Sequence, residues 1–130
     1  MPALIFDIDG TFSETEEVHR AAFNETFADL GLDWSWDRPM YKKLLEVTGG
    51  KERLRHFIDS YAPGRGSEMI DPIPAMHADK TVRYAAMIDG GAASLRPGIL
   101  RLIREARAAG YPVAIATTTS RVNLDALLAA

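Results

Sequence analysis

Two aspartates that lie two positions apart near the start of the chain are the first candidates for chemistry. Asp7 and Asp9 follow an apolar tetrapeptide, residues 3–6, and precede Gly10. Carboxylates held this close repel each other, which raises one pKa unless a cation lies between them. With Mg²⁺ bound by both, Asp7 can stay ionised as a nucleophile, while Asp9 can act as general acid and then general base. The pair therefore predicts metal-assisted nucleophilic catalysis, with Asp7 and Asp9 as catalytic residues and metal ligands.

A simple turn or a calcium loop is the competing interpretation of the same residues. Asp-x-Asp-Gly is common in turns, where Gly10 permits a sharp change of chain direction. A twelve-residue calcium loop starting at Asp7 would need Glu at its last position, and Val18 stands there. The apolar segment directly before Asp7 favours the catalytic interpretation, because ligands of open α/β sheets bind beyond the carboxyl ends of strands.

A second polar cluster, Thr117-Thr118-Thr119-Ser120, follows another apolar segment, residues 111–116. Its hydroxyl and backbone N–H groups can bind an anion, and Thr117, Thr118 and Thr119 are the predicted phosphate-binding residues. The alternative is an ordinary N-cap before a helix over residues 122–128, although a cap and a phosphate site can share the same atoms. We expect both polar clusters to face one crevice.

The elements that must position these clusters are two strands and a long helical stretch between them. Residues 3–6 and 111–116 show no alternation of apolar and polar residues, which predicts parallel strands buried on both faces. Roughly ninety residues separate them, far more than a crossover needs. The sequence thus predicts an α/β core, residues 1–14 and 96–130, with an inserted α-helical cap, residues 15–95.

Within the expected cap, apolar residues recur at helical spacing and glycine or proline marks the ends. We expect a helix that ends at Gly31, a second that ends before Gly49-Gly50, and a third that reaches Tyr61. A break rich in Pro and Gly, residues 62–74, precedes a weaker helix over residues 75–87. A junction at residues 94–98 then leads into a core helix that starts near Ile99 and ends at Gly110.

The cap also contains candidate substrate contacts. Two glycines between helices expose backbone N–H groups beside basic side chains, which suits an anion, although a plain helix-to-helix turn explains the same segment. Glu16 lies just beyond the first aspartate pair and is expected to touch substrate, as is Tyr41; Thr15 beside it can equally be a helix cap. The predicted substrate-binding residues of the cap are Glu16, Tyr41, Gly49, Gly50, Lys51, Glu52 and Arg53.

Composition excludes several classes of protein. The 130 residues carry a net charge of -3 and no long basic run, which argues against nucleic acid as a partner. The early apolar run is too short to span a membrane or serve as a signal peptide. The chain has no cysteine, which excludes thiolate catalysis and favours a cytoplasmic location. A lone histidine on a helix is usually packed or exposed, so we expect that for His19, and we expect His56 and His77 at the surface.

Asp7-Ile8-Asp9-Gly10-Thr11 resembles the first motif of the haloacid dehalogenase superfamily, and residues 115–119 resemble its second. Residues 14–19 and 48–53 look most like the CbbY-like branch beside β-phosphoglucomutase. The resemblance implies a Rossmannoid core with a helical cap and a Mg²⁺-dependent phosphatase of small phosphorylated sugars, such as the bisphosphate xylulose 1,5-bisphosphate. It also implies attack by Asp7 to give an aspartyl phosphate, and proton transfer by Asp9.

The chain departs from the superfamily after its second motif. The resemblance implies a downstream Lys and an acidic motif that completes the Mg²⁺ site, and neither occurs before Ala130. We therefore expect a truncated sequence with a longer complete form. A sugar phosphomutase with the same aspartate pair, or a catalytically silent fragment that acts as a binding module, are the alternatives. The expected partner is a small sugar phosphate, with no nucleic acid or membrane, and a monomer is favoured.

Overall fold

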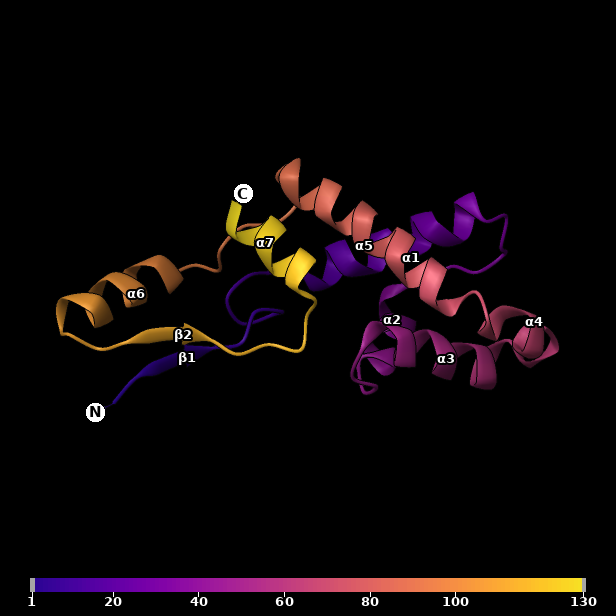
Figure 1. The fold of residues 1–130 in the computed structure, drawn as a ribbon, viewed down its shortest axis with the longest axis horizontal. Helices are drawn as coiled ribbons and strands as arrows, with labels where there is room; N and C mark the ends of the chain where they lie inside the picture. The colour runs from indigo at the N-terminus through magenta and orange to yellow at the C-terminus, as the bar shows by residue number, and fades with distance from the viewer. Residues whose placement is uncertain (1, 130) are drawn as a thin grey trace.

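The computed structural model describes residues 2–129, except for the side chains of residues 66 and 67; residues 1 and 130 of the expected core ranges lie outside it. The molecule is elongated, with the sheet and α6 at one end and α1 to α5 at the other (Figure 1). The elements in chain order are β1 (Leu4–Phe6), α1 (Glu16–Asp29), α2 (Arg38–Leu44), α3 (Gly50–Tyr61), the 3₁₀ helix η1 (Pro63–Arg65), α4 (Gly66–Ile70), α5 (Ile73–Asp89), α6 (Ile99–Ala108), β2 (Val113–Ile115) and α7 (Arg121–Ala129).

The two strands pair in parallel, which confirms the α/β class and the parallel sheet. Leu4 pairs with Val113 and Phe6 with Ile115. The prediction that both faces are buried is wrong, because Ile5 is 67% exposed. Among the described residues, α6 covers one face of the pair and packs Ile99 against it, while Ile5 points to the other face. An unbroken apolar strand therefore does not by itself establish two covered faces.

Glycines end the helices where the sequence predicts. Gly31 follows α1 with φ 68°, and Gly110 follows α6 with φ 80°. A left-handed residue just past a helix lets the chain turn away, and glycine adopts it without a Cβ penalty. The turn at Gly110 leads directly into β2, so the second polar cluster reaches the same end of the sheet as the first.

The segment expected to be a break is partly helical. Residues 62–74 contain η1 and α4, and α5 begins at Ile73 rather than near residue 75. Pro74 stands in the first turn of α5, where the missing N–H of proline removes no helical hydrogen bond. The expected weak helix over residues 75–87 is thus the longest one described, with 17 residues.

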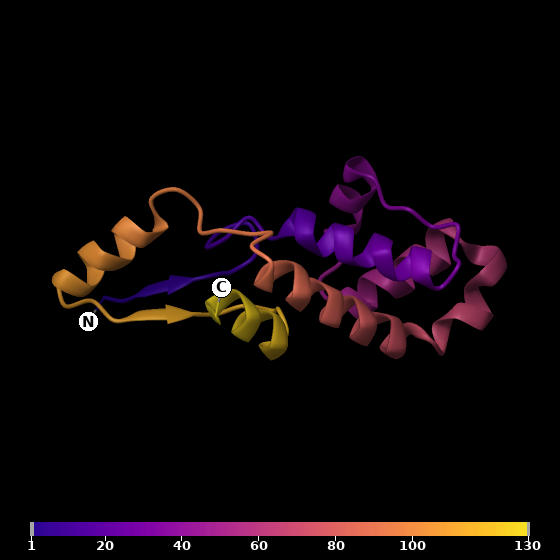
Figure 2. The ribbon, with the colours of Figure 1, turned by 90° about the horizontal axis from the view of Figure 1, so that it is seen from above.

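Two hydrophobic clusters organise the chain, and α1 and α5 contribute to both. One lies within the helical region and is centred on the fully buried Trp36 and Phe27, whose rings meet edge to face with centroids 4.9 Å apart. The other joins β1 and α7 to α1 and α5 through Phe6, Tyr84 and Leu127. Seen from above, α1 and α5 run side by side from the sheet end into the helical end (Figure 2).

Across residues 2–129, none of the helices combines the length and the apolar character that a membrane span requires.

Candidate active site

The loop after β1 folds back on itself and presents Asp7 and Asp9 at the end of the strand. Three successive N–H groups, those of residues 11–13, donate to the carbonyl oxygen of Ile8, and Gly10 has φ 74°. Arg96, from the segment before α6, donates to the carbonyl of Gly10 and forms an ion pair with Glu14 at 2.9 Å. This tight turn is held from both sides, so the direction of the two carboxylates is fixed by the backbone.

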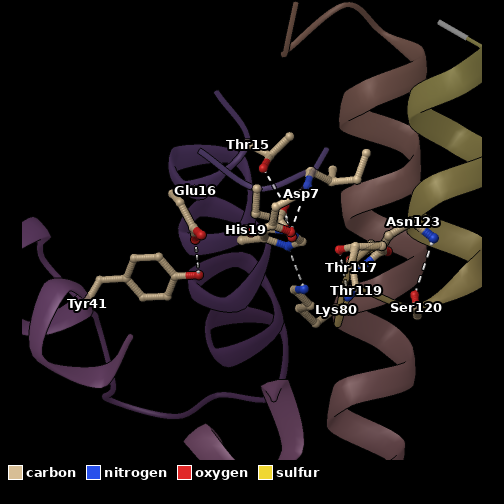
Figure 3. Close-up of polar contacts among 12 residues, drawn as sticks. Asp7, Thr15, Glu16, His19, Tyr41, Lys80, Thr117, Thr119, Ser120 and Asn123 are labelled. Atoms are coloured by element: carbon tan, nitrogen blue, oxygen red, sulfur yellow. Dashed lines mark hydrogen bonds and ion pairs between the residues drawn. The ribbon is translucent and has the colours of Figure 1, made fainter. Parts of the chain in front are cut away.

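Asp9 is half-buried, whereas Asp7 is exposed. Behind Asp9 lie Thr15, His19 and Lys80, which are labelled in Figure 3. The Thr15 hydroxyl and His19 Nε2 both bind Asp9 Oδ1, the latter at 2.9 Å. Lys80 Nζ lies 2.8 Å from the other ring nitrogen, His19 Nδ1. Thr15 occupies the N-cap position of α1, as the cap interpretation proposes, but its hydroxyl makes no cap hydrogen bond and binds Asp9 instead.

The hydrogen-bond donors determine the protonation states of His19 and Asp9. An ammonium group can only donate, so His19 Nδ1 accepts from Lys80 and Nε2 carries the proton that it donates to Asp9. Burial lowers the pKa of His19, and the charge of Lys80 lowers it further against the opposing effect of Asp9. Burial alone would raise the pKa of Asp9, but the hydrogen bonds from His19 and Thr15 and the charge of Lys80 outweigh it, and the pKa is lowered. Asp9 is therefore held ionised beside a neutral His19.

Lys80 lines the cavity, although it was not singled out from the sequence. It is 3% exposed on α5, and its Nζ lies 4.8 Å from the ring centroid of Phe23 and 5.2 Å from that of Tyr84. Burial lowers its pKa to about 8, with a further contribution from the charge of Arg53. The sequence does contain an indication of its importance, because Lys80 interrupts an apolar stripe on α5 that includes Met76 and Tyr84. A buried lysine is unfavourable at such a position unless it serves a function.

A cavity of about 440 Å³ lies between the loop after β1, the helical region and the loop before α7. It brings together most of the predicted site residues, but Thr117 and Tyr41 do not line it. His77 does line it and is half-buried, so the prediction that His77 lies at the surface is wrong, whereas His56 is exposed. The lining residues are Asp7, Asp9, Glu16, His19, Leu45, Thr48, Gly49, Gly50, Lys51, Glu52, Arg53, His77, Lys80, Thr118, Thr119, Ser120 and Asn123.

The loop before α7 combines a helix cap with a wall of the cavity. Thr117 Oγ1 accepts a hydrogen bond from Thr119 N at 3.1 Å, and Ser120 Oγ accepts one from Asn123 N at 3.3 Å. Ser120 therefore caps α7, as the alternative interpretation proposes, while Thr118 and Thr119 face the cavity. Asn123 was not singled out from the sequence; its Nδ2 donates to Thr119 Oγ1 at 3.2 Å and steadies that hydroxyl.

In the segment that joins α2 to α3 and includes the first turn of α3, Lys51 and Arg53 play different parts. Lys51 is exposed at the cavity wall. Arg53 instead donates from Nε to the carbonyl of Leu44 and from Nη2 to that of Val47, both at 3.1 Å, and its guanidinium lies over the Tyr41 ring. Arg53 thus ties this segment to the end of α2, and Lys51 is the freer of the two cations to meet an anion.

Tyr41 reaches the site through Glu16. Its hydroxyl donates to Glu16 Oε2 at 3.2 Å, while the ring is buried against Trp36 in the helical cluster (Figure 3). Burial raises the pKa of Glu16, and the neighbouring charge of Asp9 raises it further. Glu16 rather than Tyr41 is therefore positioned to contact a ligand.

The residues present fit a divalent cation. Asp7 faces the cavity, and Ile8 N–H is the one described donor to its carboxylate, at 2.7 Å. Both donors to Asp9 bind Oδ1, which leaves Oδ2 open among the described residues. No group of three or more Asp, Glu or His side chains suited to a metal occurs in residues 2–129, but Mg²⁺ commonly takes only one or two carboxylates and completes its shell with water and phosphate.

Known proteins with similar sequences match nearly the whole chain. Protein CbbY, plasmid, of Cupriavidus necator is 55% identical over 132 residues, covering 100% of this chain and 52% of that protein. Protein CbbY of Cereibacter sphaeroides is 52% identical over 125 residues, covering 96% of this chain and 53% of that protein. The chain thus spans about half the length of the curated relatives it matches.

Solved structures of a CbbY protein are also similar to this chain. CbbY from Rhodobacter sphaeroides in complex with phosphate superposes with a TM-score of 0.83 at 48% identity, covering 96% of this chain and 54% of that one. A mutant of that protein in complex with xylulose 1,5-bisphosphate gives the same values. Residues 1–130 also match the description of haloacid dehalogenase-like hydrolases. On the fold, the paired aspartates after β1 and this match, the chain belongs to the haloacid dehalogenase-like hydrolase family and is similar to its CbbY proteins.

Proposed function

We propose that the protein is a Mg²⁺-dependent phosphatase that hydrolyses a small phosphorylated sugar, with xylulose 1,5-bisphosphate as the leading candidate. The observation that carries the proposal is the cavity itself: Asp7 and Asp9 form one wall, and Lys51 and Lys80 line the helical side. A bisphosphate has two anionic groups: one can lie at the nucleophile Asp7, and the other can lie near Lys51 on the helical side of the cavity. The relative that binds this sugar is 48% identical to the chain.

In the first step a carboxylate oxygen of Asp7 attacks phosphorus, the bond to the sugar oxygen breaks, and Asp9 gives that oxygen a proton. The negative phosphoryl group beside Asp9 favours its protonated form, because a nearby like charge raises a carboxyl pKa. Thr118 and Thr119 are proposed to bind the phosphoryl oxygens through hydroxyl and backbone N–H groups. Mg²⁺, when bound beside the Asp7 carboxylate, would neutralise part of the phosphoryl charge, and Asp9 Oδ2 would have to be free of the metal in this step, since Oδ1 already accepts from Thr15 and His19.

In the second step Asp9 takes a proton from water, which attacks the aspartyl phosphate and releases inorganic phosphate from Asp7. The described arrangement suits this half of the reaction, since Thr15 and His19 hold Asp9 in its ionised form. Glu16, Gly49 and the residues of the first turn of α3, Gly50, Lys51, Glu52 and Arg53, are proposed to bind or orient the sugar and its second phosphate. A cytoplasmic, monomeric enzyme without nucleic-acid partners completes the proposal.

A catalytically silent binding module is the second candidate. It is favoured by one observation, the lack of a third acidic metal ligand near Asp7 within residues 2–129. Such a protein would bind the phosphate ester without turning it over.

The deciding experiment measures phosphate released from xylulose 1,5-bisphosphate with Mg²⁺. It compares the chain, its Asp7→Asn variant, and a form extended to the length of the CbbY relatives. Asp33→Asn is the matched control, because Asp33 is exposed and lies outside the cavity. We expect Asp7→Asn to remove turnover in every active form and Asp33→Asn to leave it unchanged.

The other outcomes separate the alternatives. Release by the extended form alone would mean that catalysis needs residues beyond position 130. Binding of the sugar without release in any form supports the silent module, and absence of both binding and release rejects this substrate. Recovery of an isomeric sugar phosphate in place of inorganic phosphate would identify a phosphomutase.

A further inference from the structure

We propose that His77 is a positioning residue for the first turn of α3: its ring fills the space that a side chain at position 50 would need. It thereby holds Gly50 and Lys51 at the cavity wall that receives the second anionic group of the substrate. The identity of that ligand rests on the proposed function, whereas the steric relationship between His77 and Gly50 does not.

The contact between the two residues is close. A Cβ atom added to Gly50 would stand 2.6 Å from His77 Cδ2, closer still to Nε2, and 3.6 Å from Phe23 Cζ. Real Cβ atoms essentially never approach other heavy atoms this closely, so a side chain at position 50 would displace the ring. Because both residues line the cavity, a displaced ring would take up space meant for the ligand.

Position 49 needs glycine for a different reason. Gly49 has φ 93° and ψ 137°, a backbone conformation that residues with a side chain rarely adopt. Gly50 has no such requirement, since it is the first residue of α3 and its φ is not positive. In a helix alanine is ordinarily favoured over glycine, so a loss of stability without ligand in Gly50→Ala would point to the contacts with His77 and Phe23.

The place of His77 on α5 gives it this role. His77 and Lys80 are three residues apart, which puts them on one face of the helix, and both line the cavity. Burial, together with the charges of Lys80 and Lys51, lowers the pKa of His77 to about 4. The ring is thus neutral at physiological pH and acts as an uncharged support between two cations.

A double-mutant cycle tests the proposal. The variants are Gly50→Ala, His77→Ala and the two combined, with Gly64→Ala as the matched control, because a Cβ at Gly64 meets nothing within 4 Å. Each is assayed in the full chain by the midpoint of thermal unfolding without ligand, and by calorimetric affinity for xylulose 1,5-bisphosphate and for inorganic phosphate.

We expect Gly50→Ala to weaken bisphosphate binding by about tenfold or more, as misplacement of a binding element does, and to change phosphate binding far less. His77→Ala alone should weaken bisphosphate binding by a smaller factor, because the first turn of α3 loses the ring that holds it in place. Adding His77→Ala to Gly50→Ala should recover affinity, since the two changes relieve each other. The same rescue should appear in the unfolding midpoint, while Gly64→Ala changes neither quantity.

Two results would overturn the proposal: a double variant no better than Gly50→Ala in both assays, or a Gly50→Ala variant indistinguishable from Gly64→Ala. Failure of the proposed function looks different. If the unaltered chain does not bind the bisphosphate but the unfolding midpoints still show the rescue, the positioning role stands and the assigned ligand falls.

Discussion

Lys80 Nζ lies 2.8 Å from His19 Nδ1, and both side chains are buried where the two hydrophobic clusters meet. Removing an ammonium group from water is unfavourable, and the lowered pKa of Lys80 records that cost. This unfavourable burial has a benefit for the proposed chemistry, because the charge of Lys80 stabilises the ionised form of Asp9 through His19. Stability and the proposed chemistry therefore oppose each other at this residue.

Lys80→Met should make the fold more stable at pH 7 while removing phosphate release. Methionine keeps the apolar contacts with Phe23 and Tyr84 and needs no hydration. The pKa of Lys80 falls from about 10.5 when unfolded to about 8 when folded, so the unfolded state binds more protons between these values and wild-type stability rises with pH there. The gain in the free energy of unfolding should be on the order of 1–3 kcal/mol below pH 8 and should shrink towards pH 10.

Urea unfolding at pH 7 and pH 10 measures this difference. Lys51→Met is the control, because Lys51 is an exposed lysine of the same cavity, and its effect on unfolding should be small at both pH values. A Lys80→Met variant that is less stable than wild type at pH 7 would contradict the argument.

Thr15→Val should lower kcat and cost about 1–2 kcal/mol of unfolding free energy. The substitution preserves shape but removes the hydroxyl that donates to Asp9, leaving that carboxylate with one donor fewer. Thr26→Val is matched to it, because Thr26 is equally buried and its hydroxyl donates to a backbone carbonyl within α1. Both variants should lose some stability by urea unfolding, but only Thr15→Val should lose kcat; an equal effect on kcat would reject a catalytic role for Thr15.

Tyr41→Phe should raise KM for the sugar several-fold with little change in kcat. The hydroxyl orients Glu16 and does not itself line the cavity, so its loss frees Glu16 to adopt other rotamers without touching the reacting atoms. Steady-state kinetics on the active form provides the measurement, with the exposed Tyr61→Phe as control. A fall in kcat at unchanged KM would place Tyr41 in the chemistry instead.

Asn24→Ala should lower the free energy of unfolding by about 1–3 kcal/mol. Asn24 accepts from the backbone N–H of Trp36 at 2.8 Å and donates to its carbonyl at 3.0 Å. Truncation leaves the Trp36 N–H unpaired beside the helical cluster, while the carbonyl keeps its hydrogen bond from Arg20. The midpoint of urea denaturation tests this against Glu25→Gln, a neutral change at an exposed position of the same helix. Equal midpoints for the two variants would show that these hydrogen bonds are dispensable.

The local order of elements follows from the sequence because its signals are short-range. Gly31 and Gly110 end helices by backbone conformation alone, and the polar residues after β1 and β2 mark the end of the sheet where the cavity forms. The exposure of Ile5 could not be predicted in this way, since burial of a strand face depends on what the rest of the fold places over it.

The pair Asp7 and Asp9 and the glycines Gly49 and Gly50 were predicted from residue type and spacing. The residues that hold them in place, Lys80 and His77, were not. Lys80 and His77 lie more than fifty residues from Asp9 in the sequence and reach the cavity only because α5 packs along α1. On a helix, a lysine and a histidine are ordinarily surface residues, and only their register within the apolar stripe of α5 distinguishes these two. The contact of His77 with Gly50 requires coordinates, because it depends on the separation of two helices.

The sharing of α1 and α5 between the two clusters has a mechanical consequence. Phe23 and Phe27 of α1 lie in the helical cluster, while Val18 and Ala22 of the same helix lie in the cluster beside the sheet. Unfolding of either cluster removes packing from the two helices on which the other cluster depends, so we expect the two ends of this elongated molecule to be coupled. The chain should consequently lose both clusters in one cooperative transition, with tryptophan fluorescence and far-ultraviolet circular dichroism changing together.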